Sequence, residues 1–140
     1  MIEINNLTKV LINKKFFEKI VQIIFKKEKK RINISIAFVG QEEIRRLNKK
    51  YRKKDRVTDV LSFGRVKEFK RGDNSEIEEI AICPSVVREN AKKYKSTFKK
   101  ELARVLIHGV LHLLGYDHEK GGEMKKKMEK KEDYYISKIL

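Results

Sequence analysis

The stretch HGVLHLLGYDH, residues 108–118, contains all three histidines of this 140-residue chain. His108 and His112 are four residues apart in a segment with the apolar spacing of a helix, so both imidazoles leave the same face. Gly115 follows one turn later, where a left-handed C-cap would end the helix and reverse the chain. The turn then brings His118 back toward the first two histidines. The stretch therefore predicts a helix, its end, and three converging imidazoles.

Three converging imidazoles are typical of a catalytic metal site, in which the fourth position is left to water. Burying imidazoles among leucines and valines is unfavourable unless the ring nitrogens find partners, and a metal is the simplest shared partner. We therefore predict one Zn²⁺ per chain held by His108, His112 and His118, and Ni²⁺ or Co²⁺ also suits these ligands. The alternatives are core histidines without a metal, or a structural metal with Cys83 as fourth ligand. A free cysteine is more often a buried strand residue.

The histidine spacing is also that of the metzincin proteases, HExxHxxGxxH, so the sequence predicts a metzincin-like metal-site helix. In those proteases the glutamate after the first histidine is the general base that activates water for peptide hydrolysis. Gly109 stands at that position and cannot accept a proton. The pattern therefore favours metal chemistry other than proteolysis.

Hydrophobic periodicity predicts strands interspersed with helices along the whole chain. We expect strands at 2–4, 31–40, 57–64 and 77–83, and helices at 14–28, 41–51, 84–94, 97–114 and 121–140. Residues 66–70 either pair with the preceding strand or lead into a loop at 71–76. The chain contains no internal repeat and no linker-like stretch. This pattern predicts one α+β domain over residues 1–140, with a small mixed β-sheet of about four strands packed with about five helices.

The charge of the chain is strongly basic: 35 Lys and Arg against 20 Asp and Glu give a net charge of +15. Such a charge favours polyanionic partners, nucleic acid above all, although thermophile proteins also carry highly charged surfaces. A single cysteine excludes an internal disulfide framework and suits a reducing compartment. Neither a secretory signal pattern nor an apolar run of membrane-spanning length is present. We therefore expect a cytoplasmic protein with no membrane partner and no disulfide-linked partner.

A second informative stretch, YRKKDRVTDVLSFG, occupies residues 51–64. Its cations Arg52, Lys53, Lys54 and Arg56 precede a strand, where a loop can present them to the phosphates of RNA. Taken alone, such a lysine-rich loop is usually just solvated. Taken together, HGxLHLxGYDH downstream of YRxxDxxTDVLSF resembles the YbeY family of bacterial metal-dependent endoribonucleases, and the match in length and element order extends over nearly the whole chain.

The resemblance implies an α+β domain, a zinc held by three histidines, and cleavage of single-stranded RNA. It also implies a role in maturing the 3′ end of small-subunit rRNA and in ribosome quality control, with rRNA and the ribosome as partners. Carried over by position, the metal ligands are again the three histidines, and the arginine required for activity is Arg52. The sequence departs from the family at Glu78 and Glu79, where the usual residues are Gly and Asp.

The chemistry of phosphodiester cleavage suits these groups. A metal held by three histidines lowers the pKa of a bound water to about 7, and a guanidinium matches the charge that develops on the phosphate oxygens. We therefore predict catalytic roles for Arg52 and for His108, the latter as a ligand of the metal. Both a metal-activated water and the 2′-hydroxyl of the RNA remain candidate nucleophiles. Asp117 or Glu119 is a candidate for orienting a histidine through its second ring nitrogen.

Two other functions compete with the nuclease. The first is a non-catalytic ribosome- or RNA-binding protein whose metal only fastens helix to loop. The second is a metalloprotease, which would need a general base at another position because Gly109 cannot accept a proton.

Tyr51 and Tyr116 either stack on unpaired bases or pack within the protein.

Overall fold

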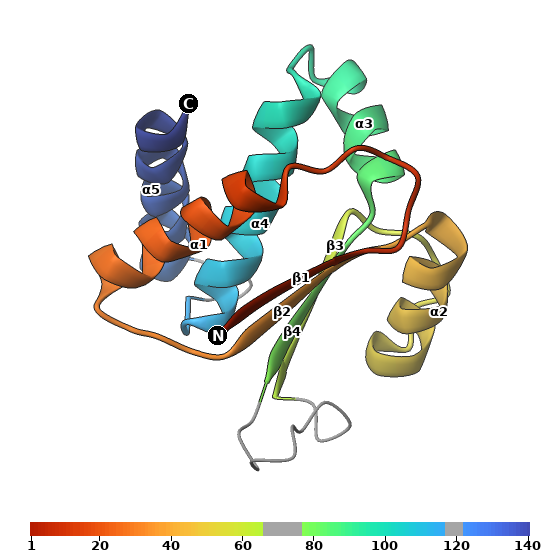
Figure 1. Cartoon of the computed structure of the whole chain (residues 1–140), viewed down its shortest axis with the longest axis horizontal. Coiled ribbons are helices and arrows are strands. Elements are labelled where there is room, and N and C mark those ends of the chain that lie inside the picture. Colours follow the sequence, from red (N-terminus) through yellow and green to blue (C-terminus); the bar gives the residue numbers. More distant parts are fainter. Residues whose placement is uncertain (66–76, 117–121) are drawn as a thin grey trace.

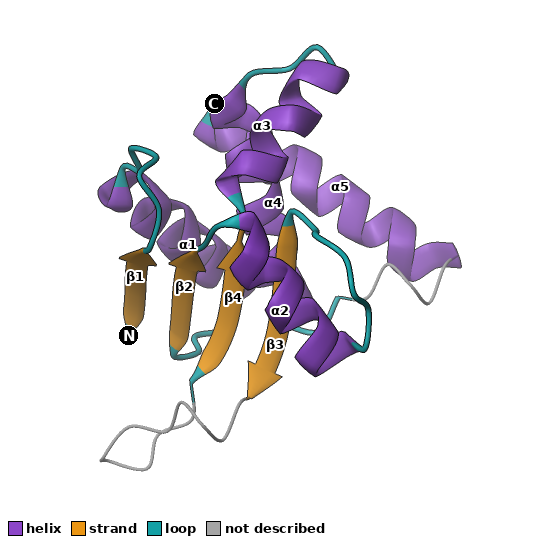
Figure 2. Cartoon of the chain, turned by 90° about the vertical axis from the view of Figure 1, so that its right-hand side faces the viewer, coloured by secondary structure: helices purple, strands orange, loops and turns teal. Residues whose placement is uncertain are grey.

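The sheet of the protein has four strands within the residues that the computed structural model describes, 1–65, 77–116 and 122–140. The strands are β1 (Ile2–Asn6), β2 (Ile34–Phe38), β3 (Val60–Arg65) and β4 (Glu78–Ile82). Their spatial order is β1-β2-β4-β3 (Figure 2). The β1–β2 and β2–β4 pairs are parallel, whereas β3 runs antiparallel to β4, with a break in register between Ser62 and Gly64. The sheet is therefore mixed, as predicted, and β3 is an edge strand.

Five helices surround this sheet in the same described ranges. They are α1 (Lys14–Glu28), α2 (Gln41–Arg52), α3 (Pro84–Lys93), α4 (Phe98–Leu113) and α5 (Gly122–Ile139). Local signals explain where several of them begin. Asn13 caps α1 by accepting from the Phe16 N–H at 3.2 Å, and Thr97 caps α4 by accepting from the Lys100 N–H at 3.1 Å. The predicted α+β architecture, with about four strands and about five helices, is confirmed.

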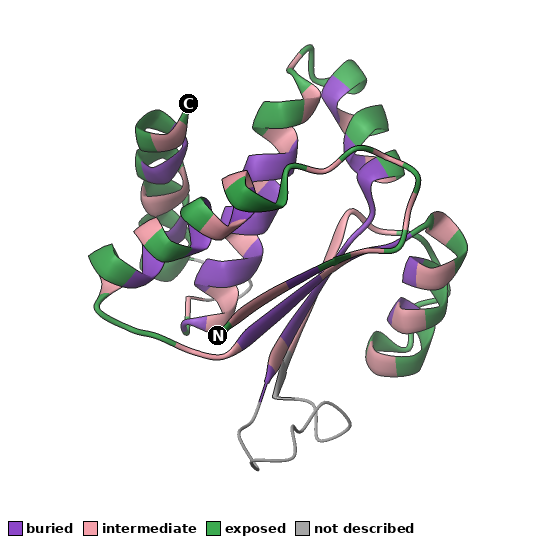
Figure 3. Cartoon of the chain, viewed as in Figure 1, coloured by how far each residue is buried: buried purple, intermediate pink, exposed green. Residues whose placement is uncertain are grey.

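The helices cover the two faces of the sheet unequally (Figure 1). Helices α1 and α4 pack on one face, with α5 packed against α4, and alternate strand residues such as Ile36 and Ile80 meet Ile20 and Leu106 in the main core. Helix α2 packs on the other face over a smaller apolar cluster: Val39, Ile44, Leu61, Ala81 and Cys83. Buried residues gather where α1 and α4 meet the sheet (Figure 3). The main core therefore supports α4, which carries the histidines.

Gly109 allows α4 to pack unusually close to the sheet. A Cβ atom at this position would lie 3.1 Å from Cδ1 of Ile80 and 3.3 Å from Oγ of Ser62. Both separations are tighter than ordinary van der Waals contact. The residue after the first histidine therefore lies where the backbone of α4 is close to the side chains of β3 and β4, and a side chain there would be crowded.

Some sequence predictions fall on parts of the chain outside the described residues. These are the segments 66–70 and 71–76, and in the histidine motif Asp117, His118 and Glu119. Among the described helices, none combines the length and the apolar character needed to cross a membrane.

Candidate active site

His108 and His112 lie on the same side of α4, as their spacing predicts. Their ring centroids are 5.5 Å apart, with the ring planes at 84°. The helix ends at Leu113, as expected just before Gly115, whose φ of +110° lies in the region that favours glycine. The Gly115 N–H donates to the His112 carbonyl and the Tyr116 N–H to the Leu111 carbonyl, both at 3.1 Å. This pair of bonds is a Schellman motif, so the turn that leads toward the third predicted ligand has a fixed start.

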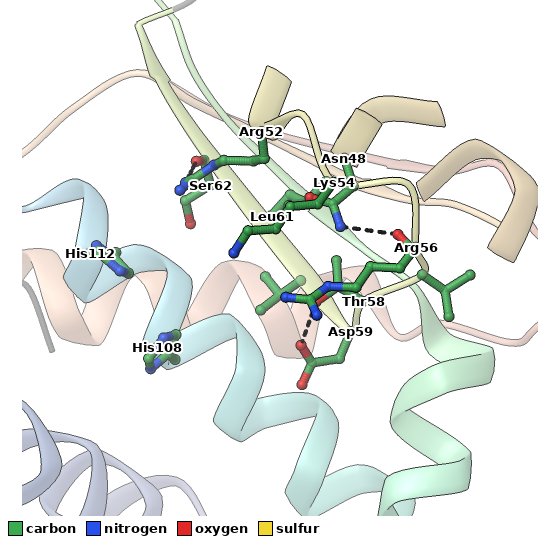
Figure 4. Close-up of a pocket in the computed structure, with 12 residues that line it drawn as sticks. Asn48, Arg52, Lys54, Arg56, Thr58, Asp59, Leu61, Ser62, His108 and His112 are labelled. Atoms are coloured by element: carbon green, nitrogen blue, oxygen red, sulfur yellow. Dashed lines mark hydrogen bonds between the residues drawn. The ribbon is translucent and has the colours of Figure 1, made fainter. Parts of the chain in front are cut away.

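A cavity of about 490 Å³ lies beside the two histidines at the β3 edge of the sheet. His108 and His112 line it from α4, Arg52 lines it from the end of α2, and the stretch 54–62 supplies much of the remaining wall. Figure 4 shows these side chains around the same space. The structure thus brings together two of the predicted metal ligands and the predicted catalytic arginine.

Ser62 connects the two sequence motifs through hydrogen bonds. Arg52 donates from Nη2 to the Ser62 carbonyl oxygen at 2.8 Å, which holds one side of the guanidinium against β3 (Figure 4). The Ser62 hydroxyl in turn donates to the Gly109 carbonyl oxygen at 3.4 Å. The arginine and the histidine helix are therefore positioned by the same strand residue.

Gly109 also bears on the protease alternative. The α-carbon of this residue faces Ile80 and Ser62 across a gap that is tight even for a methyl group. Any side chain here would press on the Ile80 and Ser62 side chains, which would have to move by a few tenths of an ångström. The position that holds the general base in metzincins is therefore a packing position in this protein.

Asn48 fixes the loop that carries the cations, a role that no sequence pattern predicted. Its side chain is buried on α2 and donates from Nδ2 to the Arg56 carbonyl oxygen at 3.0 Å. Its own carbonyl accepts from the Lys54 N–H at 3.3 Å. The sequence could have indicated this role, because Asn48 lies four residues after Ile44 on the buried face of a helix. A buried amide there is unfavourable unless it finds a hydrogen-bond partner.

The four predicted RNA-binding cations do not share one orientation. Arg52, Lys54 and Arg56 line the cavity. Lys53 does not, because it is the left-handed C-cap of α2, with φ +56°. Figure 4 shows Arg56 pointing toward Asp59, so its charge is partly offset within the cavity wall. Arg52 and Lys54 are the better placed cations for a phosphate, and the RNA contacts of all four stay predictions.

Glu132 on α5 contacts His108, a contact that no sequence pattern predicted. Its Oε1 lies 2.5 Å from Nδ1 of His108, and the two side chains are only 13% and 28% exposed. A carboxylate in this place accepts the Nδ1 hydrogen, so a metal would coordinate the ring through Nε2. The signal was an acidic residue on the apolar side of α5, four residues from the buried Met128 and Ile136.

Glu28 anchors α5 and the turn after α4 to the end of α1. Its buried carboxylate accepts hydrogen bonds from Tyr116 at 2.7 Å, from Tyr135 at 2.5 Å, and from Lys131 at 2.8 and 3.1 Å. Burial opposes the ionisation of Glu28, but Lys131 and the two hydroxyls together outweigh it and lower the pKa of the carboxyl. The Tyr116 hydroxyl is therefore bound to α1, and the ammonium groups of Lys127 and Lys131 lie over its ring.

Two further alternatives of the sequence analysis are resolved by packing. Cys83 is fully buried in the cluster under α2, on the other face of the sheet from the histidines, and burial raises the pKa of its thiol. It is a buried residue and not a metal ligand in this arrangement. Tyr51 packs on Phe63, with ring centroids 4.9 Å apart, and the ammonium of Lys50 lies over its ring.

The residues present fit a metal of the zinc type. Two imidazoles lie on one helix face beside a cavity, and a carboxylate supports one of them from behind. In the ranges that the structure describes, no group of three or more His, Cys, Asp or Glu side chains is placed to hold a metal. The described residues therefore supply two of the three predicted ligands, and His118 stays a prediction.

Comparisons with known proteins identify the family of this chain. The model of the family described as Endoribonuclease YbeY matches residues 3–140. An Endoribonuclease YbeY from Thermotoga maritima is 41% identical over 122 residues, 87% of this chain and 77% of the relative. The protein of the same name from Aquifex aeolicus is 42% identical over 108 residues, 77% of this chain and 71% of the relative.

A solved structure agrees as well. The solution structure of TM1509 from Thermotoga maritima aligns with a TM-score of 0.69 and 37% identity, over 99% of this chain and 89% of that one. The resemblance inferred from the two motifs is thus confirmed over nearly the whole length. The chain belongs to the Endoribonuclease YbeY family, a family of endoribonucleases.

Proposed function

We propose that this protein is a zinc-dependent endoribonuclease that cleaves single-stranded RNA at the cavity beside α4. The proposed ligands of the zinc are His108, His112 and His118, and the proposed catalytic groups are Arg52 and the metal ligand His108. The observation that supports this function most is the cavity itself, which is lined by Arg52 together with two histidines of the motif.

Each proposed residue has a distinct task. A zinc ion held by the histidines would lower the pKa of a bound water and withdraw charge from a phosphoryl oxygen. Arg52 is held on one side by Ser62, and its planar guanidinium carries further N–H donors that match two phosphate oxygens at once. Those donors bind most strongly to the charge that builds up as the phosphodiester bond breaks. Lys54 adds positive charge to the cavity wall and attracts the RNA backbone.

The biological substrate that we propose is the 3′ end of small-subunit rRNA, with a further role in ribosome quality control in the cytoplasm. The family resemblance supports this substrate, and the net charge of +15 supports a polyanionic partner. Incubating the purified protein with a precursor of the small-subunit rRNA 3′ end, free and within ribosomal particles, tests the assignment. Cleavage at random positions in both forms would contradict it.

The enzymatic activity is tested by cleavage of an unstructured RNA oligonucleotide before chelation, after chelation, and after zinc is added back. The proposal predicts loss of cleavage with the chelator and recovery with zinc. A duplex RNA of the same sequence serves as the control for single-strand preference, and an unstructured protein serves as the control for proteolysis. Binding of the oligonucleotide without cleavage in every condition would favour the non-catalytic RNA-binding protein instead.

A further inference from the structure

We propose that Glu132 is a positioning residue of the metal site: its carboxylate holds the hydrogen of His108 on Nδ1 and so directs Nε2 of that ring to the metal. The inference rests on the proposed zinc site. It assigns a task to α5, a helix that contributes no residue to either sequence motif.

The contact itself is short and sheltered. Oε1 of Glu132 lies 2.5 Å from Nδ1 of His108, and the Glu132 side chain is 13% exposed. The adjacent residue on α5 provides a comparison, because Asp133 also faces α4. Its carboxylate lies 3.8 Å from Arg104, and its side chain is 77% exposed. The Glu132 contact is therefore not one of the loose surface ion pairs of a charged helix, which contribute little.

The position of Glu132 is set by packing on both sides. Met128, Tyr135 and Ile136 are buried at helical spacing around it, so the same face of α5 that enters the core presents the carboxylate to α4. The preceding residue, Lys131, binds the buried carboxylate of Glu28. These contacts hold α5 in place, and a carboxylate on such a helix can select one orientation of an imidazole.

The chemistry explains why this contact matters for a metal. A neutral imidazole carries its hydrogen on either nitrogen, and the nitrogen without hydrogen is the one that can bind a metal. A carboxylate at Nδ1 stabilises the form with the hydrogen on Nδ1. Metal-binding histidines usually have such a partner, and its removal weakens metal binding by about 10–100-fold.

The first test uses the metal-free 140-residue chain and compares the wild type with two variants. Two-dimensional ¹H–¹⁵N spectra of the imidazoles at about pH 8.5, well above the ordinary imidazole pKa of about 6.5, report which ring nitrogen carries the hydrogen. With only three histidines, three single substitutions assign the spectrum. The proposal predicts that His108 carries its hydrogen on Nδ1 in the wild type and in Asp133→Ala, and loses this preference in Glu132→Ala. A His108 ring with its hydrogen on Nε2 in the wild type would overturn the proposal.

The second test measures zinc affinity by competition with a chelating dye. Glu132→Ala should bind zinc about 10–100-fold more weakly than the wild type. Glu132→Gln should lose less, because its amide oxygen still accepts the Nδ1 hydrogen, and Asp133→Ala should bind as the wild type does. Two results would overturn the proposal: wild-type affinity in Glu132→Ala, or losses in Glu132→Gln as large as in Glu132→Ala, which would indicate that Glu132 is a metal ligand.

These readouts are independent of RNA cleavage. If the spectra and the zinc affinities behave as predicted while no variant cleaves RNA, the positioning role of Glu132 stands and the proposed enzymatic function fails. If the wild type cleaves RNA with zinc while Glu132→Ala keeps its tautomer and its zinc affinity, the function stands and the inference on Glu132 fails.

Discussion

The two faces of the sheet contribute different halves of the candidate site. The face covered by α1, α4 and α5 has a large apolar core, and it carries the histidines and two supported carboxylates, Glu28 and Glu132. The face covered by α2 has a smaller core, and it carries Arg52 and the cationic loop. The halves meet at the edge strand β3. The difference suggests that rigid packing is used where metal ligands must converge, whereas an open, charged surface is used where RNA must enter.

Removing one ligand from the well-packed face should have the largest effect. We expect His112→Ala to lose bound metal completely while keeping its fold, because the ring is partly exposed at the cavity wall and not part of the core. Elemental analysis of the purified variant, with circular dichroism as the folding control, tests this. The same metal content in the variant and the wild type would remove His112 from the site and contradict the assignment of the metal ligands to this face.

Changing the arginine on the α2 face should reduce the rate of cleavage and spare the metal. Arg52→Ala should lower single-turnover cleavage at saturating RNA by about 10²–10³-fold, because one electrostatic contact to the developing charge is lost. Arg52→Lys should also be slow, since it keeps the charge but not the planar arrangement of donors. Zinc content serves as the control for both variants. Wild-type rates in both would exclude Arg52 from the chemistry.

Two buried carboxylates, one on each face, should affect stability with opposite signs. Glu79 lies on the α2 face. Burial and the negative charge of Glu3 raise its pKa, a hydrogen bond from Ser35 lowers it, and the result is a pKa of about 7. A raised pKa favours folding at low pH, and this contribution is lost as the pH rises through the folded value. The free energy of unfolding of Glu79→Gln should therefore rise relative to that of the wild type as the pH increases from about 5 to about 8, by up to about 3 kcal/mol.

The matched control on the other face is Glu28→Gln. The pKa of Glu28 is lowered, so its contribution to stability is present above the unfolded pKa and is lost as the pH falls through the folded value. This variant should be destabilised at about pH 8, by about 1–3 kcal/mol. Urea unfolding of the metal-free variants at both pH values measures the two effects. Parallel pH profiles for the wild type and Glu79→Gln would contradict the first expectation.

The smallest effects should come from the lysines of the cationic loop. Lys54 lines the cavity and Lys53 does not, so Lys54→Ala should weaken RNA binding modestly and more than Lys53→Ala, with turnover at saturating RNA nearly intact in both. Each phosphate contact that is lost should reduce the slope of log K against log salt by about 0.7. Equal slopes in the wild type and Lys54→Ala would show that the cavity wall is not the RNA path.

Local patterns in the sequence predicted much of the fold and the family. The histidine spacing and Gly115 predicted α4 and its end, and alternating apolar residues predicted β2, because such patterns depend on neighbours in the chain. The roles of Glu132 and Glu28 were not predictable in this way. Their partners are 24 to 107 residues away, and only packing brings them together. The different orientations of the cations were missed for a local reason, because the left-handed cap of α2 falls on Lys53 and no glycine marks it in the sequence.

The most direct test of the central claim measures bound zinc and RNA cleavage on the same sample. Zinc is titrated into the metal-free 140-residue chain, and the single-turnover cleavage rate of an unstructured RNA is recorded at each step. The account predicts that the rate rises in proportion to bound zinc and reaches a plateau at about one zinc per chain, as a three-histidine site with one open position requires. His112→Ala should stay inactive throughout. Cleavage by the metal-free chain at the rate of the zinc-loaded chain, or one bound zinc per chain with no cleavage, would contradict it.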